Sequence, residues 1–389
     1  MNGCTCEMLR PGIDSTGVCR FTWDLEEETV TVERLWSGEF RVYFVSRPEW
    51  IVGSHLWSIA AFCGGVPPST KRLQAGWNLQ IDGKGRRTLR VARPPHLSRS
   101  LIDNYSRVLK LVKELVLESV GRATGPAALL LSGGLDSSII AAAATKHRKN
   151  IQAFVFGLRR NIRPQRECEN DFIHAERVAA YLGLTCEKIF VNPRKLRGNV
   201  PLAVALAETP RGTIVDDCVA LIEVARHLRS RGFSIVWSGD GADDLFGGFK
   251  FVLNYYRGRA LTQYFRRSLD VALPDELAII QRVFEAWRIS VVHPFWTAEL
   301  KAIGRSLPLE HRIDRQRLMK RILRDAFSDS LPEEIWNRPK GATRDTTQVR
   351  WVLEREFGSS RERYRPVFHK IFRSELKWPR NGKDLATKK

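Results

Sequence analysis

The chain has 389 residues, 43% of them hydrophobic, which is enough for one large or two medium domains with a buried core. The net charge of +20 is spread along the chain, which is typical of a solvated surface, so we do not expect specific nucleic-acid binding. No apolar run approaches the length of a membrane span, no signal pattern opens the chain, and the seven cysteines form no Cys-x-x-Cys pair. We therefore expect a cytoplasmic protein with no membrane partner, no zinc site and reduced thiols.

Residues 1–97 are rich in β-forming side chains and predict a small, mostly β domain. Consecutive prolines within residues 93–98 predict an extended linker after it. Asp82-Gly83 is typical of a hairpin turn, and residues 55–62 favour a short helix. The expected strands are 30–32, 40–45, 50–52, 77–81 and 88–91.

From residue 98 onward, apolar runs typical of buried strands alternate with helical periodicity. The expected strands are 127–131, 151–157, 186–191 and 233–237, and the expected helices are 101–120, 137–144, 171–182 and 217–231. This alternation predicts an α/β fold with a doubly wound parallel sheet over residues 98–345. Residues beyond about 250 are expected to be largely helical, and residues 346–389 to form a basic C-terminal tail.

The run Ser132-Gly133-Gly134-Leu135-Asp136-Ser137-Ser138 lies between a buried strand and a helix. Backbone N–H groups and the positive end of the helix dipole meet there, which predicts a phosphate site. The glycines allow close backbone approach, and the serine hydroxyls can donate hydrogen bonds. The carboxylate of Asp136 repels phosphate unless a cation intervenes, which predicts Mg²⁺. No Walker-type Gly-Lys-Ser/Thr follows.

A second polar run, Ser238-Gly239-Asp240-Gly241-Ala242-Asp243-Asp244-Leu245-Phe246-Gly247-Gly248-Phe249, follows another buried strand. Ligands of doubly wound sheets bind beyond the carboxyl ends of such strands. Its glycines and acidic residues are more typical of a site that binds a metal and a nucleotide than of a hydrophobic core.

The first run resembles the pyrophosphatase loop of enzymes that cleave ATP between its α- and β-phosphates, and the second resembles a signature of the asparagine synthetase family. Glu208-Thr209-Pro210 and Arg338-Pro339-Lys340-Gly341 agree in family order. The resemblance covers roughly residues 100–345 and implies an adenine nucleotide α-hydrolase-like fold. It also implies that a carboxylate attacks the α-phosphorus of ATP, and that ammonia or an amine then converts the acyl-adenylate into an amide, releasing AMP.

The resemblance also implies roles for individual residues. On the nucleotide side, the backbones of Leu131 and Phe156 match those that hold adenine, and Ser238 and Gly239 match nucleotide contacts. Ser132, Gly133, Gly134 and Ser137 match the pyrophosphate cradle.

For the chemistry, Asp136 and Asp243 match the Mg²⁺ ligands. Asp240 matches the acid tied to adenylate formation and amine deprotonation. Lys320 and Lys340 match lysines that offset charge on the phosphates. The alternative for Lys320 is a solvated lysine on a helix, and the alternative for Lys340 is a lysine in a surface loop.

Two stretches depart from the family pattern. Glutamine-hydrolysing members carry a catalytic cysteine directly after the initiator methionine, where this chain has Asn2, with Cys4 and Cys6 nearby. We interpret residues 1–97 as a shortened, inactive glutaminase-like domain. The family's Gly-x-Glu-x-Arg-x-Pro-Phe-Leu-Asp is replaced by residues 288–297, which keep Pro294-Phe295 and lack the acid, the arginine and the final aspartate.

The leading hypothesis is therefore an ATP- and Mg²⁺-dependent ligase that makes asparagine from aspartate and ammonia through β-aspartyl-AMP. We expect it to have no glutaminase activity and to form a homodimer.

 The alternatives are a ligase acting on another carboxylate, of the β-lactam-forming or peptide-cyclising type, a tRNA-modifying ATP pyrophosphatase, and a non-catalytic nucleotide-binding relative. The intact acids Asp136, Asp240 and Asp243 argue against the last of these.

Overall fold

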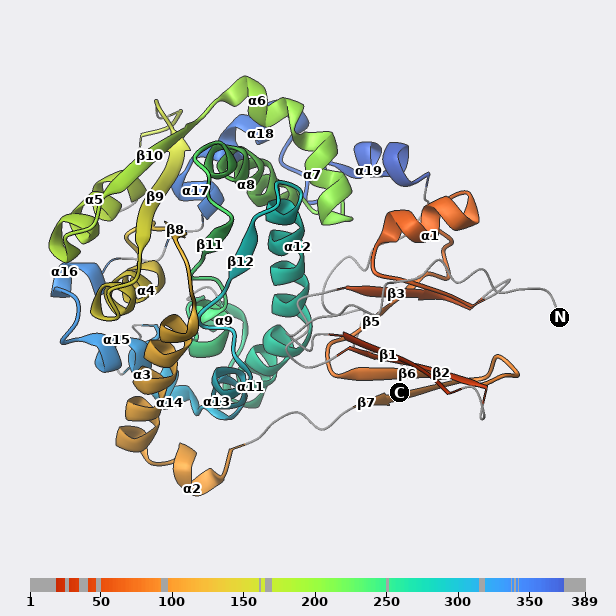
Figure 1. Ribbon diagram of the computed structural model, residues 1–389, viewed down its shortest axis with the longest axis horizontal. Coiled ribbons are helices and arrows are strands. Elements are labelled where there is room, and N and C mark those ends of the chain that lie inside the picture. Colours follow the sequence, from red (N-terminus) through yellow and green to blue (C-terminus); the bar gives the residue numbers. More distant parts are fainter. Residues whose placement is uncertain are drawn as a thin grey trace.

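The computed structural model describes residues 19–24, 28–34, 41–46, 50–91, 97–160, 162–164, 170–249, 252–314, 319–336, 338, 341 and 343–373. An α/β body and a pair of small antiparallel sheets lie side by side (Figure 1). No helix among the described residues combines the length and apolar character needed to cross a bilayer.

The body is built on a five-stranded parallel sheet in the order β10-β9-β8-β11-β12. Its strands are β8 (Ala127–Leu130), β9 (Ile151–Leu158), β10 (Cys186–Val191), β11 (Ile235–Trp237) and β12 (Ser290–Val292). The chain adds strands outward from β8 on one side and then returns to add β11 and β12 on the other. The sheet is therefore doubly wound, as the alternation of strands and helices predicts, while the short strand β12 was not predicted.

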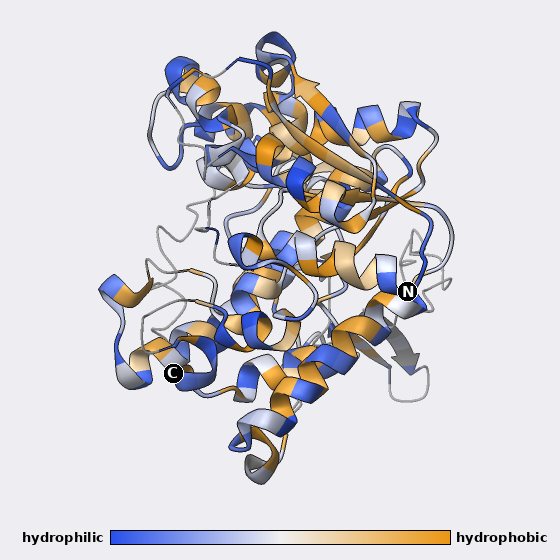
Figure 2. Cartoon of the chain, turned by 90° about the vertical axis from the view of Figure 1, so that its left-hand side faces the viewer, coloured by the Kyte–Doolittle hydropathy of each residue, from blue (hydrophilic) through white to orange (hydrophobic). Residues whose placement is uncertain are grey.

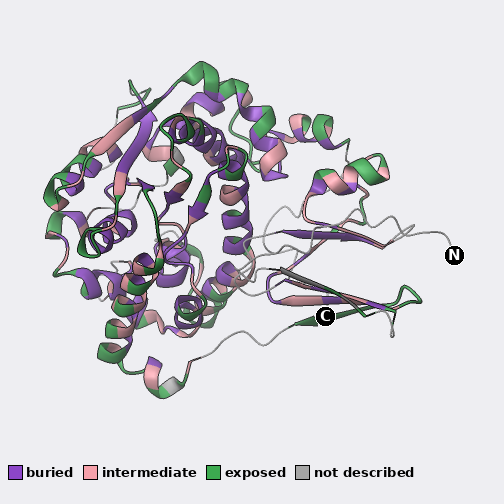
Figure 3. Cartoon of the chain, in the orientation of Figure 1, coloured by how far each residue is buried: buried purple, intermediate pink, exposed green. Residues whose placement is uncertain are grey.

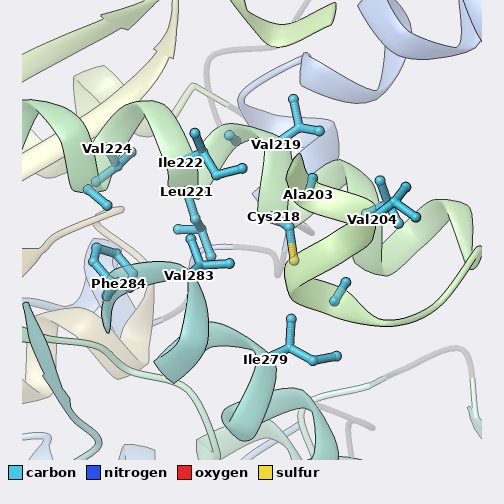
Figure 4. Packing of buried hydrophobic residues seen from close by; sticks show 14 of the residues in the cluster. Ala203, Val204, Cys218, Val219, Leu221, Ile222, Val224, Ile279, Val283 and Phe284 are labelled. Carbon is cyan, nitrogen blue, oxygen red and sulfur yellow. The ribbon is translucent and has the colours of Figure 1, made fainter. Parts of the chain in front are cut away.

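Helices cover both faces of this sheet, and the sheet separates two hydrophobic cores. One face carries α6 (Pro193–Gly198), α7 (Val200–Ala207), α8 (Gly212–Ser230), α12 (Leu273–Glu285), α18 (Val349–Phe357) and α19 (Arg365–Phe372). The other carries α3 (Tyr105–Arg122), α4 (Leu135–Lys146), α5 (Asp171–Leu182), α9 (Ala242–Phe246), α13 (Ala298–Ser306) and α15 (Arg321–Phe327). Figure 4 shows α7, α8 and α12 packed through aliphatic side chains around Cys218.

The sequence pattern explains these helices. In α3 the buried residues Val108, Val112, Val116 and Val120 recur every four positions, and the side chain of Asn104 caps the first turn. Figure 2 shows hydrophobic and hydrophilic residues alternating along the helices, and Figure 3 shows the sheet strands largely buried. The remaining helical segments are α2 (Arg99–Ile102), α10 (Val252–Tyr255), α11 (Gly258–Arg267), the π-helix η2 (Ser268–Ala272), α14 (Leu309–Arg312), α16 (Glu333–Trp336) and α17 (Thr343–Thr346).

The C-terminal segment differs from the expected basic tail. Helices α18 and α19 pack into the body, where Tyr364, Phe368 and Phe372 are buried. The aromatic spacing in this segment is helical, and Arg363 between the two helices pairs with the buried Asp216. Residues 374–389 lie outside the described part of the chain.

The N-terminal part consists of two antiparallel sheets, β1-β2-β6-β7 and β4-β3-β5, with the helix α1 (Leu56–Cys63). The strands are β1 (Cys19–Asp24), β2 (Thr29–Arg34), β3 (Val42–Val45), β4 (Ile51–Gly53), β5 (Lys71–Leu73), β6 (Trp77–Ile81) and β7 (Arg87–Val91). Val32, Phe44, Leu73 and Leu79 belong to one small core of buried residues. The mostly β character matches the expectation, although β1 and β5 were not predicted.

Buried charges join the N-terminal sheets to the body. Glu208, which is fully buried after α7, accepts hydrogen bonds from the Tyr43 hydroxyl (2.8 Å), the Leu56 backbone amide (2.5 Å) and the Arg282 guanidinium. Asp275 of α12 pairs with Arg72 of β5 at 2.7 Å in the same way. A buried carboxylate needs such partners, because an unpaired charge in the interior is costly.

We expect Glu208→Gln to lower the free energy of unfolding by about 3 kcal/mol or more, because it leaves the buried Arg282 without its charged partner. The measurement is urea unfolding followed by far-UV circular dichroism. Glu114→Gln is the control, since the exposed Glu114 pairs only loosely with Lys110 and its loss should cost less than about 1 kcal/mol. Equal effects of the two substitutions would contradict a structural role for Glu208.

Candidate active site

The two polar runs of the sequence meet at the point where the strand order reverses. Strands β8 and β11 are parallel neighbours, and each run follows the carboxyl end of one of them. The loops are in close contact, because a Cβ added to Gly239 would lie 3.1 Å from both Cβ of Asp136 and the backbone nitrogen of Ser137. The structure thus brings the predicted pyrophosphate cradle and the second acidic run together at the usual ligand position of such sheets.

The first loop is organised by its own hydroxyl groups. The backbone amide of Ser132 donates to Oγ of Ser137 at 3.3 Å, the amide of Gly134 donates to Oγ of Ser132 at 3.3 Å, and Oγ of Ser137 donates to the Gly134 carbonyl at 3.2 Å. Helix α4 begins immediately afterwards, at Leu135. Its N-terminus therefore faces the loop, as an anion site requires. The buried Ser138 hydroxyl has no hydrogen-bond partner among the described residues and takes no part in this network.

 

Gly133 is the position in this loop where a side chain is least tolerable. Its φ of +69° lies in the left-handed region, and a Cβ there would approach the backbone carbon of His174 to 2.3 Å. Both the conformation and the contact with α5 therefore require glycine.

Lys320 lies between the two predicted metal ligands. Its ammonium is 2.6 Å from both carboxylate oxygens of Asp136 and 2.5 Å from Oδ1 of Asp243, and the side chain is buried. The resemblance placed this lysine near the phosphates, and the structure brings it to the same carboxylates that the resemblance assigns to Mg²⁺. Lys320 itself has a φ of +57° at the N-terminus of α15, so the packing around it holds an unfavourable backbone conformation.

The two carboxylates fit a cation, because they already converge on one positive group. Among the described residues, no three His, Cys, Asp or Glu side chains gather as a metal site, so the protein would supply a carboxylate pair and leave the other positions to phosphate oxygens and water. This donor set is typical of magnesium bound together with a nucleotide. It fits the ion that the sequence predicts.

The other two acids of the second loop have different surroundings. The Ser238 hydroxyl donates to Oδ2 of Asp240 at 2.6 Å, and Asp240 is half-buried. Burial, which outweighs the opposing hydrogen bond from the Ser268 hydroxyl, and the nearby Asp243 carboxylate together raise the pKa of Asp244 to about 7. Asp244 is therefore held inside the protein by its hydrogen bond with Ser268 of η2, whereas Asp240 is held within the loop by Ser238.

The predicted adenine-side residues lie at neighbouring strand ends. The backbone amide of Leu131 donates to the carbonyl of Phe154 at 2.8 Å, which fixes the chain directly after β8. Phe156 lies near the end of β9, and both Leu131 and Phe156 are buried. Leu131, Phe156, Ser238 and Gly239 therefore lie at or near the carboxyl ends of three adjacent strands, β9, β8 and β11.

Sequence reasoning missed one residue that supports the loop. The guanidinium of Arg338 donates to the Ser132 carbonyl and to Oδ1 of Asp171, both at 2.6 Å, and Thr346 donates to Oδ2 of Asp171 at 2.7 Å. Arg338 thus ties the cradle to the start of α5. The Arg-Pro-Lys-Gly run was the available signal, but it drew attention to Lys340, which lies outside the described residues.

The altered stretch 288–297 forms β12 and the turn that follows it. Arg288 has a φ of +56°, which fits a position where the family pattern has glycine. Val292 pairs with Trp237 at the end of the sheet, and the Trp296 amide donates to the His293 carbonyl at 2.8 Å, closing a turn with Pro294 at its second position. Thr297 accepts a hydrogen bond from the Leu300 amide at 3.2 Å and caps α13.

Comparison with known proteins agrees with this geometry. The asparagine synthase family profile matches residues 110–265 and 255–370. The glutamine-hydrolysing asparagine synthetase of Rattus norvegicus is 29% identical over 225 residues, which are 56% of this chain and 39% of that protein. The enzyme of the same name from Asparagus officinalis is 26% identical over 244 residues, 58% of this chain and 40% of its own. The chain thus spans well under half the length of either relative.

Among solved structures, the NMN synthetase of Francisella tularensis is similar at 13% identity with a TM-score of 0.33, over 70% of this chain and 99% of that one.

We expect Gly133→Ala to abolish ATP binding and to destabilise the protein, because the added Cβ collides with the backbone of α5. Gly183→Ala is the matched control: Gly183 has nearly the same φ, +67°, but no atom lies within 4 Å of its added Cβ. The control should lose only about 1 kcal/mol of stability, from the backbone conformation, and keep ATP binding. Thermal unfolding and calorimetric titration with ATP measure both effects. Retained ATP affinity in Gly133→Ala would contradict the assignment of the cradle.

Proposed function

Because the chain belongs to the asparagine synthase family, we propose that it is an ATP-dependent ligase that activates a carboxylate as an acyl-adenylate and then forms an amide with ammonia or an amine. The observation that carries this proposal is the convergence of Asp136 and Asp243 on one cationic group at the switch point of the sheet. The first loop supplies the phosphate cradle, and the second supplies Asp240 beside it.

The first step brings two anions together, so electrostatic stabilisation has to carry most of it. The N-terminus of α4 and the amides of the Ser132–Ser137 loop would bind the β- and γ-phosphates. Lys320, and Lys340 by resemblance, would offset charge that develops on the leaving pyrophosphate. A magnesium ion held by Asp136 and Asp243 would supply further charge neutralisation at the phosphates.

In the second step the nitrogen attacks the acyl carbon, a C–N bond forms, and the bond from that carbon to the AMP oxygen breaks. The nitrogen loses one proton for the amide to form. Asp240, beside the cradle, is the acid that the resemblance links to both steps. We propose aspartate and ammonia as substrates, giving asparagine.

A specific observation favours a second candidate, a ligase of the same kind with another carboxylate as substrate. Val292 and Thr297 replace the arginine and the aspartate of the family pattern, and Thr297 is used to cap α13. These positions therefore offer no charged group to a polar acceptor such as aspartate.

The test is pyrophosphate release from ATP and Mg²⁺ with aspartate and ammonium present, and then with each omitted. We expect release that depends on aspartate, and asparagine that appears only with ammonium. Protein that binds ATP and releases no pyrophosphate with aspartate would overturn aspartate as the substrate and favour the second candidate.

We expect Asp136→Asn to lower pyrophosphate release at least about 100-fold, because it removes a charge that balances Lys320 and would bind magnesium. Asp329→Asn is the control, since Asp329 is an exposed acid that pairs with Lys113 and belongs to neither loop. Turnover is measured at saturating ATP, and circular dichroism checks the fold. Turnover equal to that of the control would remove Asp136 from the mechanism.

A further inference from the structure

A buried histidine lies beside the second loop. His293 follows β12 directly, and the Ser238 amide donates to the carbonyl of the preceding Val292 at 3.0 Å. A Cβ on Gly241 would lie 3.9 Å from both Phe295 and Trp296, so the turn after β12 packs against the loop that carries Asp240. His293 therefore lies at the carboxyl edge of the sheet, next to the acid linked to amide formation.

The imidazole of His293 is unusual in having no hydrogen-bond partner. The residue is 6% exposed, and within the described part of the chain neither Nδ1 nor Nε2 has a donor or acceptor in reach. Leaving a buried polar group unsatisfied costs about 1–3 kcal/mol, so such a group in a native site calls for an explanation. A substrate nitrogen or a proton would supply the missing partner.

The charges around His293 favour a neutral ring that can accept a proton. Burial lowers the pKa of His293, and the Asp240 carboxylate acts in the opposite direction. Of the charged groups on the neighbouring helices, Glu276 of α12 is an acid close enough to interact with Asp240, and the Lys301 ammonium of α13 lies 4.5 Å from the Trp296 ring centroid. Asp240 is thus placed to stabilise an imidazolium once it forms.

The sequence supplies the second observation. The family's acid is replaced by Ser290, which lies at the opposite end of β12, paired with Ile235, and the arginine is replaced by Val292. His293, one residue further, is the basic side chain that this stretch places directly after the carboxyl end of β12, beside the second loop.

We propose that His293 is a catalytic residue that takes the proton lost by the attacking nitrogen, with Asp240 stabilising the imidazolium. This inference rests on the proposed function. As the C–N bond forms, a proton passes from nitrogen to the imidazole, and AMP leaves with the electron pair of the broken C–O bond. The proton then returns to water.

The test separates the two half-reactions in His293→Gln. We expect pyrophosphate–ATP exchange with aspartate to remain within about 3-fold of wild type, and ammonium-dependent amide formation to fall by about 10²-fold or more. Hydroxylamine should restore much of the turnover, because it is a weaker base than ammonia and its nitrogen loses a proton more readily. At a fixed concentration of free ammonia, wild-type amide formation should fall as the pH drops through the pKa of His293, and this acid limb should disappear in the variant.

His311→Gln is the matched control, because His311 is also a buried histidine with an unpartnered Nδ1 but packs against Tyr105 on α3. It should leave both half-reactions unchanged. Equal loss of exchange and amide formation in His293→Gln, or no loss of either, would overturn the role of His293 while the proposed function stands. A wild-type protein without aspartate-dependent exchange would instead overturn aspartate as substrate, and this role for His293 with it.

Discussion

The site depends on a balance of charge between two carboxylates, the buried Asp136 and the half-buried Asp243, and one buried ammonium, that of Lys320. Asp136 and Asp243 come from loops about a hundred residues apart, and the parallel pairing of β8 with β11 brings them together. Two such carboxylates repel each other unless a positive group lies between them. Lys320 provides that group from a third segment, so α4, α9 and α15 are joined at one point. A divalent cation at these carboxylates would take over the balance and free the lysine for phosphate oxygens.

The sequence predicted the parts of the fold that depend on local pattern. Apolar runs such as 127–131 and 151–157 are long and continuous because both faces of these strands are buried, and they coincide with β8 and β9. The strand β12 has three residues, too few for any periodicity. Helices α18 and α19 were overlooked because their basic residues dominate the composition, whereas their few buried aromatics decide the packing.

The candidate site, like the fold, was predictable only where it depends on contiguous residues. The Ser-Gly-Gly and Ser-Gly-Asp-Gly runs are contiguous, so the type of ligand that they suit can be inferred from the sequence alone. Arg338 supports the cradle from more than two hundred residues away, and His293 lies in a stretch that the sequence marks only by the family acid, arginine and aspartate that are absent from it. Contacts between distant segments leave no pattern in a single sequence. The structure is needed to find them.

The buried network around Glu208 has a consequence for how this chain could have evolved. The carboxylate, Tyr43 and the Leu56 amide form a joint in which each side satisfies polar groups of the other. Deleting the N-terminal sheets would leave charged groups of the body, such as Glu208 and Arg282, without some of their partners, so selection for a folded body would retain these sheets. The N-terminal sheets would then be kept for the stability of the body, independently of any substrate that they bind.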